Sequence, residues 1–232
     1  MAALTLKAVT VEYPIYNSSN RSLRNRLVSI GMAGRIRSDA RHVVTVAALD
    51  GIDLALSKGD RIGLTGGNGS GKTTLLRTMA GILRPTKCTI SVVGSVSTLF
   101  ALGAGLDVEL NGYENILRMG MLLGASHASA EASIPEIEAF TELGEFLAMP
   151  VRTYSAGMLA RLMFAVATAV HPDILLVDEV IGAGDGEFQK KAQARMAAFV
   201  EKASILVFAS HSPDLVAGYC ERTLRMDRGK IL

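Results

Sequence analysis

The sequence has little cysteine and no apolar run long enough to cross a membrane. Cys88 and Cys220 fit no metal-ligand spacing and are too few for a disulfide framework, which favours a reducing cytosol. The apolar run from Leu162 to Val170 is well short of the roughly 20 residues that a membrane span needs. The N-terminus also lacks a secretion-signal pattern. We therefore expect any membrane association to come through a partner or a surface helix.

A strong excess of one charge is absent as well. The net charge is +2 over 232 residues, which is too small for a dedicated nucleic-acid binder. Positive charge gathers near the N-terminus, where residues 1–50 contain seven Lys or Arg and three acidic residues. Residues 17–45 form a basic insertion that includes the basic arm 21–41. Within it, Leu23, Leu27, Ile30 and Gly34 would share one face of a short amphipathic helix. Two interpretations stay open, a solvated surface or a contact with anionic lipid headgroups or a membrane protein.

Short apolar and β-branched runs predict the strands. The runs Arg61–Leu64, Ile174–Val177 and Ile205–Ala209 suit strands that are buried on both faces of a parallel sheet. Segments Leu4–Tyr13 and Ala47–Leu56 alternate apolar and polar residues, which is typical of half-buried antiparallel strands at one edge. Helical patterns separate these runs. The predicted fold class is therefore α/β with a mostly parallel sheet and antiparallel edge strands.

A helical subdomain is expected inside this core. Strand signals fade between about residues 99 and 170, where 111–123 and 134–147 are the clearest helical segments. The core would then consist of 1–98 and 171–232, so the chain forms one domain with an inserted subdomain.

A glycine-rich loop carries the strongest chemical signal. Residues 66–73 match G-x-x-x-x-G-K-[ST], with the predicted strand before them and a helical run after them. Such a loop turns backbone N–H groups toward phosphate oxygens, and the helix adds its positive N-terminal dipole. Lys72 would reach the β- and γ-phosphates, and the Thr73 hydroxyl would bind Mg²⁺. The expected nucleotide contacts are Gly66, Asn68, Gly69, Ser70, Gly71, Lys72, Thr73 and Thr74.

Two later strands end in polar residues. Asp178 and Glu179 follow an apolar run, and because strand residues alternate in direction, the two carboxylates cannot share one role. Asp178 fits a Mg²⁺ ligand, while Glu179 can polarise an attacking water. His211 follows another strand. Parallel strands deliver their carboxyl ends to one edge, so we expect these residues to act with Lys72.

The order of these motifs resembles the ATP-binding subunit of ABC transporters over nearly the whole chain. The resemblance implies a P-loop NTPase core, ATP hydrolysis, and ATP with Mg²⁺ as cofactors. The matching segments are the P-loop 66–74, the helical insertion 99–150, the signature 154–158, the magnesium-binding strand 174–179, the D-loop 182–185 and the switch residue His211.

The signature segment narrows the resemblance. Tyr154-Ser155-Ala156-Gly157-Met158 stands where the family usually has LSGGQ. Together with LVDEVIGAGDGEFQKK and LGAGLDVELNGYENI, it is similar to the branch that exports lipid-linked O-antigen, capsule or teichoic-acid chains. This branch implies a subunit on the cytoplasmic face of the inner membrane beside a separate polytopic permease. A non-transport ABC ATPase of the ribosome or nucleic acid is the alternative.

The resemblance also implies a head-to-tail homodimer that encloses two ATP molecules. Ser155 and Gly157 of one copy would face the γ-phosphate held by Lys72 of the other. Asp185 fits the loop that signals across the dimer, and His211 would contact the γ-phosphate and orient Glu179.

The adenine contact rests on an aromatic residue. Tyr13 stands where the family stacks a ring on adenine, although Tyr16 lies close enough to compete.

Two departures from the family pattern stand out. The only glutamines are Gln189 and Gln193, so the expected Gln at the join between core and subdomain is replaced at about Ala101. Coupling to the permease would then run through shape and backbone movement around 103–109. Cys88 stands where the family usually has Gly, so either a Cys takes a strained positive φ or the turn differs.

Overall fold

In the computed structural model, the chain folds into two compact units. The structure describes residues 2–15, 36–38, 44–99, 103, 105–178, 186–210 and 212–232. The first unit joins 1–94 with 205–232, and the second unit is 95–204. This division places 171–204 in the second unit, whereas the sequence analysis assigned that stretch to the core. Within the described ranges, no helix combines the length and the apolar character that a membrane crossing requires.

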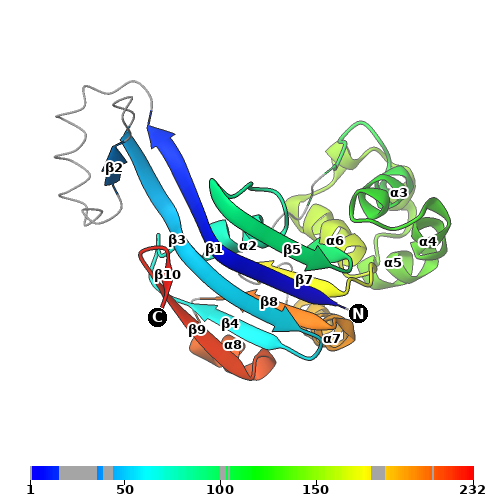
Figure 1. The fold of residues 1–232 in the computed structure, drawn as a ribbon. Helices are drawn as coiled ribbons and strands as arrows, with labels where there is room; N and C mark the ends of the chain where they lie inside the picture. The colour runs from blue at the N-terminus through cyan, green and yellow to red at the C-terminus, as the bar shows by residue number, and fades with distance from the viewer. Residues whose placement is uncertain are drawn as a thin grey trace. The chain divides into compact units, whose positions relative to one another are not determined.

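The first unit contains an antiparallel sheet. β1 (Ala3–Ile15) and β3 (Val44–Ser57) pair antiparallel, as predicted. β5 (Lys87–Val93) pairs with the other side of β1, and β2 (Ile36–Ser38) pairs with β3. The order is thus β2-β3-β1-β5, and β1, β3 and β5 lie side by side in Figure 1. These strands form a sheet of their own rather than extending the edge of the parallel one.

Parallel strands form the second layer of the first unit. β4 (Arg61–Thr65) lies between β8 (Ile205–Ala209) and β9 (Arg222–Asp227) and is parallel to both. β10 (Lys230–Ile231) pairs antiparallel with β9. Every residue of β8 is buried, as expected for a central strand of an α/β sheet. The predicted α/β class is confirmed for this unit.

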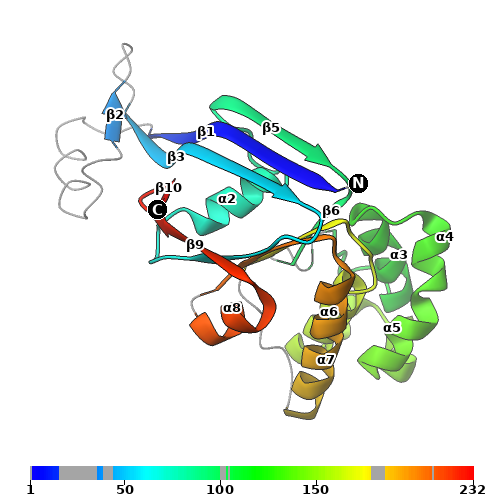
Figure 2. The same ribbon diagram turned by 60° about the horizontal axis from the view of Figure 1, so that its bottom comes forward.

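Two helices cover these strands. α2 (Lys72–Met79) contacts both β3 and β8, so it packs against both sheets (Figure 2). α8 (Pro213–Tyr219) packs on β4 and β8. Gly63 permits this packing, because a Cβ there would lie 2.2 Å from Cγ1 of Val216.

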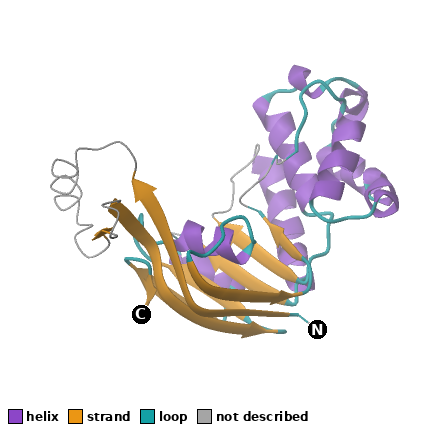
Figure 3. Ribbon diagram, turned by 45° about the horizontal axis from the view of Figure 1, so that its top comes forward, coloured by secondary structure: helices purple, strands orange, loops and turns teal. Residues whose placement is uncertain are grey.

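The second unit is mostly helical and also contains a pair of parallel strands, β6 (Val96–Thr98) and β7 (Ile174–Asp178). The helices are grouped together in Figure 3. They are α3 (Gly112–Leu122), α4 (His127–Ala132), α5 (Ile134–Thr141), α6 (Ala156–Ala167) and α7 (Gly186–Lys202), with the 3-10 helices η1 (Gly144–Ala148) and η2 (Val151–Thr153).

The single helix predicted over 134–147 is wrong. α5 ends at Thr141 because Glu142 takes left-handed angles, with φ of 55°. A residue with these angles interrupts the helical hydrogen-bond ladder. η1 then begins at Gly144. The helix predicted over 111–123 is confirmed, and Asn111 caps it through a reciprocal pair of bonds with Glu114.

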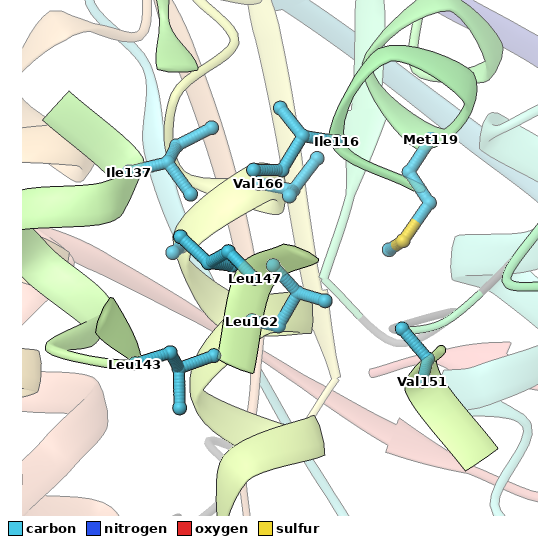
Figure 4. Packing of buried hydrophobic residues seen from close by; sticks show 9 residues of the cluster. Ile116, Met119, Ile137, Leu143, Leu147, Val151, Leu162 and Val166 are labelled. Atoms are coloured by element: carbon cyan, nitrogen blue, oxygen red, sulfur yellow. The ribbon is translucent and has the colours of Figure 1, made fainter. Parts of the chain in front are cut away.

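One apolar cluster joins these helices, and Figure 4 shows its side chains pointing toward one another. Each of α3, α5, η1 and α6 contributes residues that are almost fully buried. The cluster consists of Ile116, Met119, Ile137, Leu143, Leu147, Val151, Leu162, Ala165 and Val166. α6 supplies three of these residues. The cluster therefore anchors the helix that directly follows Ser155.

Cys88 lies in β5 with φ of 72°, so the turn keeps the angle that suits Gly. Left-handed angles cost an L-residue roughly 1–2 kcal/mol, and Gly in a strand costs about 0.5–1 kcal/mol. We therefore expect Cys88→Gly to raise the free energy of unfolding by about 0.5–1 kcal/mol in urea titrations. Cys88→Ala keeps the Cβ and serves as the control. Equal stability of the two variants would contradict this prediction.

Candidate functional site

The glycine-rich loop lies between β4 and α2 in the first unit. Lys72, the first residue of α2, is buried, and its Nζ donates hydrogen bonds to the carbonyl oxygens of Gly66 at 2.7 Å and Gly67 at 3.3 Å. The ammonium group therefore lies inside the curve of the loop. A phosphate that enters the loop would offer this cation charged oxygens in place of neutral carbonyls.

Two glycines of the loop are required by its surroundings. A Cβ at Gly66 would lie 2.3 Å from the carbonyl oxygen of Met226, and one at Gly71 would lie 2.8 Å from that of Ala48. Both glycines have positive φ, 145° and 112°. The loop therefore needs Gly for its backbone angles and for the close approach of β3 and β9.

The C-terminal hairpin stabilises this loop directly. The backbone N–H of Gly229 donates to the carbonyl of Ser70 at 2.7 Å, and the N–H of Asp50 donates to the carbonyl of Gly229 at 2.9 Å. The sequence does not predict these contacts. No local pattern marks them, because they join residues more than a hundred positions apart.

The N-terminus of α2 has no side-chain cap among the residues that the structure describes. Its cap, Gly71, has no side chain to accept a hydrogen bond, and its first turn contains no acidic residue. Thr73 is exposed and Thr74 is half-buried there, while Asn68 and Gly69 of the loop are exposed. Helix N-termini of this kind bind phosphate through backbone N–H groups and the helix dipole.

Tyr13 lies in β1 opposite Val46, and 43% of its surface is exposed. An exposed ring is able to stack on a base. The role of Tyr13 toward adenine stays a prediction. Tyr16 lies outside the described residues.

Of the predicted acidic and switch residues, Asp178 lies within the described part of the chain. Asp178 ends β7 and is half-buried. Glu179, Asp185 and His211 lie outside the described residues, as does Ala101 at the join. Their roles stay predictions.

Ser155 is the N-cap of α6, because its Oγ accepts a hydrogen bond from the N–H of Met158 at 3.2 Å. Ser155 and Gly157 are both exposed. A Cβ at Gly157 would meet only the Ser155 Oγ, at 3.9 Å. The fold of the single chain therefore does not require Gly at 157, and the exposed turn is free to approach a ligand.

Residues 108–110 form hydrogen bonds with residues 151–152, just before the signature segment. The N–H of Val151 donates to the carbonyl of Leu110 at 2.9 Å, and the N–H of Arg152 donates to that of Val108 at 3.0 Å. The Arg152 side chain also pairs with Glu109. These contacts join 108–110 to the residues that lie three to four positions before Ser155.

A comparison with protein families matches residues 49–182 to the family described as ABC transporter. The chain is 55% identical over 231 residues to the O-antigen export system ATP-binding protein RfbE of Yersinia enterocolitica, covering 100% of this chain and 97% of that protein. It is also 34% identical to RfbB of Klebsiella pneumoniae, another O-antigen export system ATP-binding protein, covering 96% of this chain and 89% of that one.

Longer relatives and solved structures also match. The teichoic acids export ATP-binding protein TagH of Bacillus anthracis is 35% identical over 96% of this chain but only 39% of its own length. Among solved structures, a dimeric ATP-binding cassette in a post-hydrolysis state bound to ADP and Pi has a TM-score of 0.69, with 20% identity, over 98% of this chain and 96% of that one. That likeness confirms the predicted cassette fold.

Proposed function

Because this chain belongs to the ABC transporter family, we propose that it is the ATP-hydrolysing subunit of a polysaccharide exporter. It would power export of a lipid-linked, O-antigen-like glycan across the bacterial inner membrane, with a separate transmembrane subunit. The full-length similarity to the O-antigen export protein of Yersinia enterocolitica carries this proposal. The ribosome or nucleic-acid alternative is not favoured, because the relatives reported above are export proteins.

ATP binding would begin at the glycine-rich loop. Its N–H groups and the N-terminus of α2 would bind the phosphates, and Lys72 would exchange the carbonyls of Gly66 and Gly67 for phosphate oxygens. Tyr13 would stack on the adenine. The loop is already curved around the Lys72 ammonium group in this structure.

The donor chemistry fits Mg²⁺, which prefers oxygen ligands and is bound in such sites by few protein groups together with substrate phosphates. The exposed Thr73 hydroxyl and the Asp178 carboxylate would hold the ion, which would neutralise phosphate charge when bound. Glu179 would accept a proton from the attacking water, and His211 would orient that carboxylate.

The second copy would complete the site. Ser155 and Gly157 stand exposed at the start of α6, where a helix N-terminus can bind an anion. We expect that anion to be the γ-phosphate held by another copy, in a homodimer that also uses Asp185. The subunit would act at the cytoplasmic face of the membrane, and the basic segment 21–41 would aid its contact with the membrane or the permease.

A co-purification experiment tests the transport assignment. The chain is expressed with and without its polytopic membrane partner, and membranes and cytosol are separated. We expect the chain in detergent-solubilised membranes only when the partner is present. A chain that remains in the cytosolic fraction and never co-purifies would contradict export, and salt-dependent binding to RNA or DNA would favour the alternative.

Ser155→Arg separates the cap from the signature role. Loss of the cap should cost about 1 kcal/mol of stability, and a bulky cation should block the phosphate contact. We expect folded, ATP-binding protein with little hydrolysis in a phosphate-release assay. Ser126→Arg is the matched control, because Ser126 caps α4 by the same 3.2 Å bond. Equal hydrolysis by the two variants would remove Ser155 from the site.

A further inference from the structure

Tyr154 directly precedes Ser155, and its side chain reaches a neighbouring helix of the same subdomain. Its hydroxyl donates a hydrogen bond to the carbonyl oxygen of Phe146 in η1, at 2.7 Å. Phe146 lines the same open pocket as Ser155, Gly157 and Met158. A single hydroxyl therefore connects the signature turn to η1, which also lines that pocket.

The absence of a side chain at Gly112 leaves room for the Tyr154 hydroxyl. A Cβ at Gly112, the first residue of α3, would lie 2.6 Å from the Tyr154 Oη and 3.0 Å from the Cα of Leu147. The start of α3, η1 and the signature turn thus meet around one oxygen atom. The ring of Tyr154 by itself would fill the space at this position. The hydrogen bond from its hydroxyl also fixes the orientation of the ring.

The hydroxyl is suited to act as a permanent donor. Burial and the neighbouring Tyr113 raise the pKa of Tyr154 above its ordinary value, so the phenol stays protonated at neutral pH. The carbonyl of Phe146 also accepts the N–H of Met149 at 2.8 Å, and a carbonyl oxygen has two lone pairs for these two bonds.

We propose that Tyr154 is a positioning residue: its bond to Phe146 holds Ser155 and Gly157 in the orientation that the γ-phosphate of a second copy requires. This inference rests on the proposed function. A Leu at this position, as in the usual LSGGQ signature, would fill space without making the bond. Tyr154 acts through the backbone turn and contacts no phosphate itself.

Tyr154→Phe tests the proposal, because it keeps the ring and removes the hydroxyl. The variant is made in a Glu179→Gln background, and two quantities are measured: the affinity of the single copy for a fluorescent ATP analogue, and the ATP-dependent dimer by sedimentation. We expect unchanged nucleotide affinity and a dimer about 25-fold weaker, because one neutral hydrogen bond corresponds to about fivefold and the homodimer contains two signature turns.

The matched control is Tyr113→Phe, which removes a hydroxyl from the same subdomain. The Tyr113 hydroxyl bonds the Glu138 side chain at 3.1 Å, whereas the Tyr154 hydroxyl bonds the carbonyl of Phe146. This control should leave the dimer unchanged. An equal effect of the two variants, no effect of Tyr154→Phe, or a Tyr154→Phe protein that does not fold would each overturn the positioning role.

The parent Glu179→Gln protein distinguishes the two levels of failure. If it does not dimerise with ATP, the proposed homodimer fails. If it dimerises and Tyr154→Phe dimerises equally well, only the role of Tyr154 fails.

Discussion

Glu179→Gln is expected to lower ATP turnover by about 10²- to 10⁴-fold while ATP binding is retained. The amide has nearly the shape of the carboxylate but cannot accept a proton from the attacking water. ATP would therefore persist in the site, and the ATP-bound dimer would accumulate. Turnover is measured by phosphate release and dimer formation by sedimentation with ATP.

Glu131→Gln is the control for this charge change, because Glu131 lies exposed on α4. It should hydrolyse ATP at the rate of the unmodified protein. Near-normal hydrolysis by Glu179→Gln would remove Glu179 from the role of general base and would turn attention to His211.

Lys72→Ala is expected to weaken ATP binding itself, by about tenfold to a hundredfold. Hydrogen bonds to charged groups contribute roughly 1.5–3 kcal/mol each, and Ala supplies neither donor nor charge. The variant also loses the bonds from Nζ to Gly66 and Gly67, so the curved loop is stabilised less before nucleotide arrives. Affinity is measured by titration with a fluorescent ATP analogue.

Arg77→Ala provides the control on the same helix. Arg77 is exposed in the last turn of α2, one to two turns from the loop. Its removal changes the charge equally and should leave affinity within about twofold, since exposed charges are screened by solvent. An affinity of Lys72→Ala equal to that of Arg77→Ala would contradict the phosphate role of Lys72.

These two variants test different steps of one reaction. Lys72→Ala should lose binding and hydrolysis together, whereas Glu179→Gln should lose hydrolysis alone. Dimer formation with ATP should then be strong in Glu179→Gln and weak in Lys72→Ala. This opposite behaviour of the two variants is expected for a dimer that closes on bound nucleotide.

Local patterns in the sequence predicted the parts that depend on neighbouring residues. The loop 66–73 was recognisable because its chemistry is carried by residues within eight positions. Strands β4, β7 and β8 were predicted nearly to their ends, since buried strands are apolar at every position. Ser155 directly precedes an apolar helix, a position where Ser commonly caps, and its Oγ accepts the N–H of Met158 there.

Other features could be decided only by the tertiary structure, because they depend on residues far apart in the chain. The carbonyls of Met226 and Ala48 exclude a side chain at Gly66 and Gly71, although no local signal marks either approach. The helix predicted over 134–147 ends early, so that η1 can bring the carbonyl of Phe146 to Tyr154. The sequence by itself thus determined the chemistry available to this protein, and only its folding decided how that chemistry is held in place.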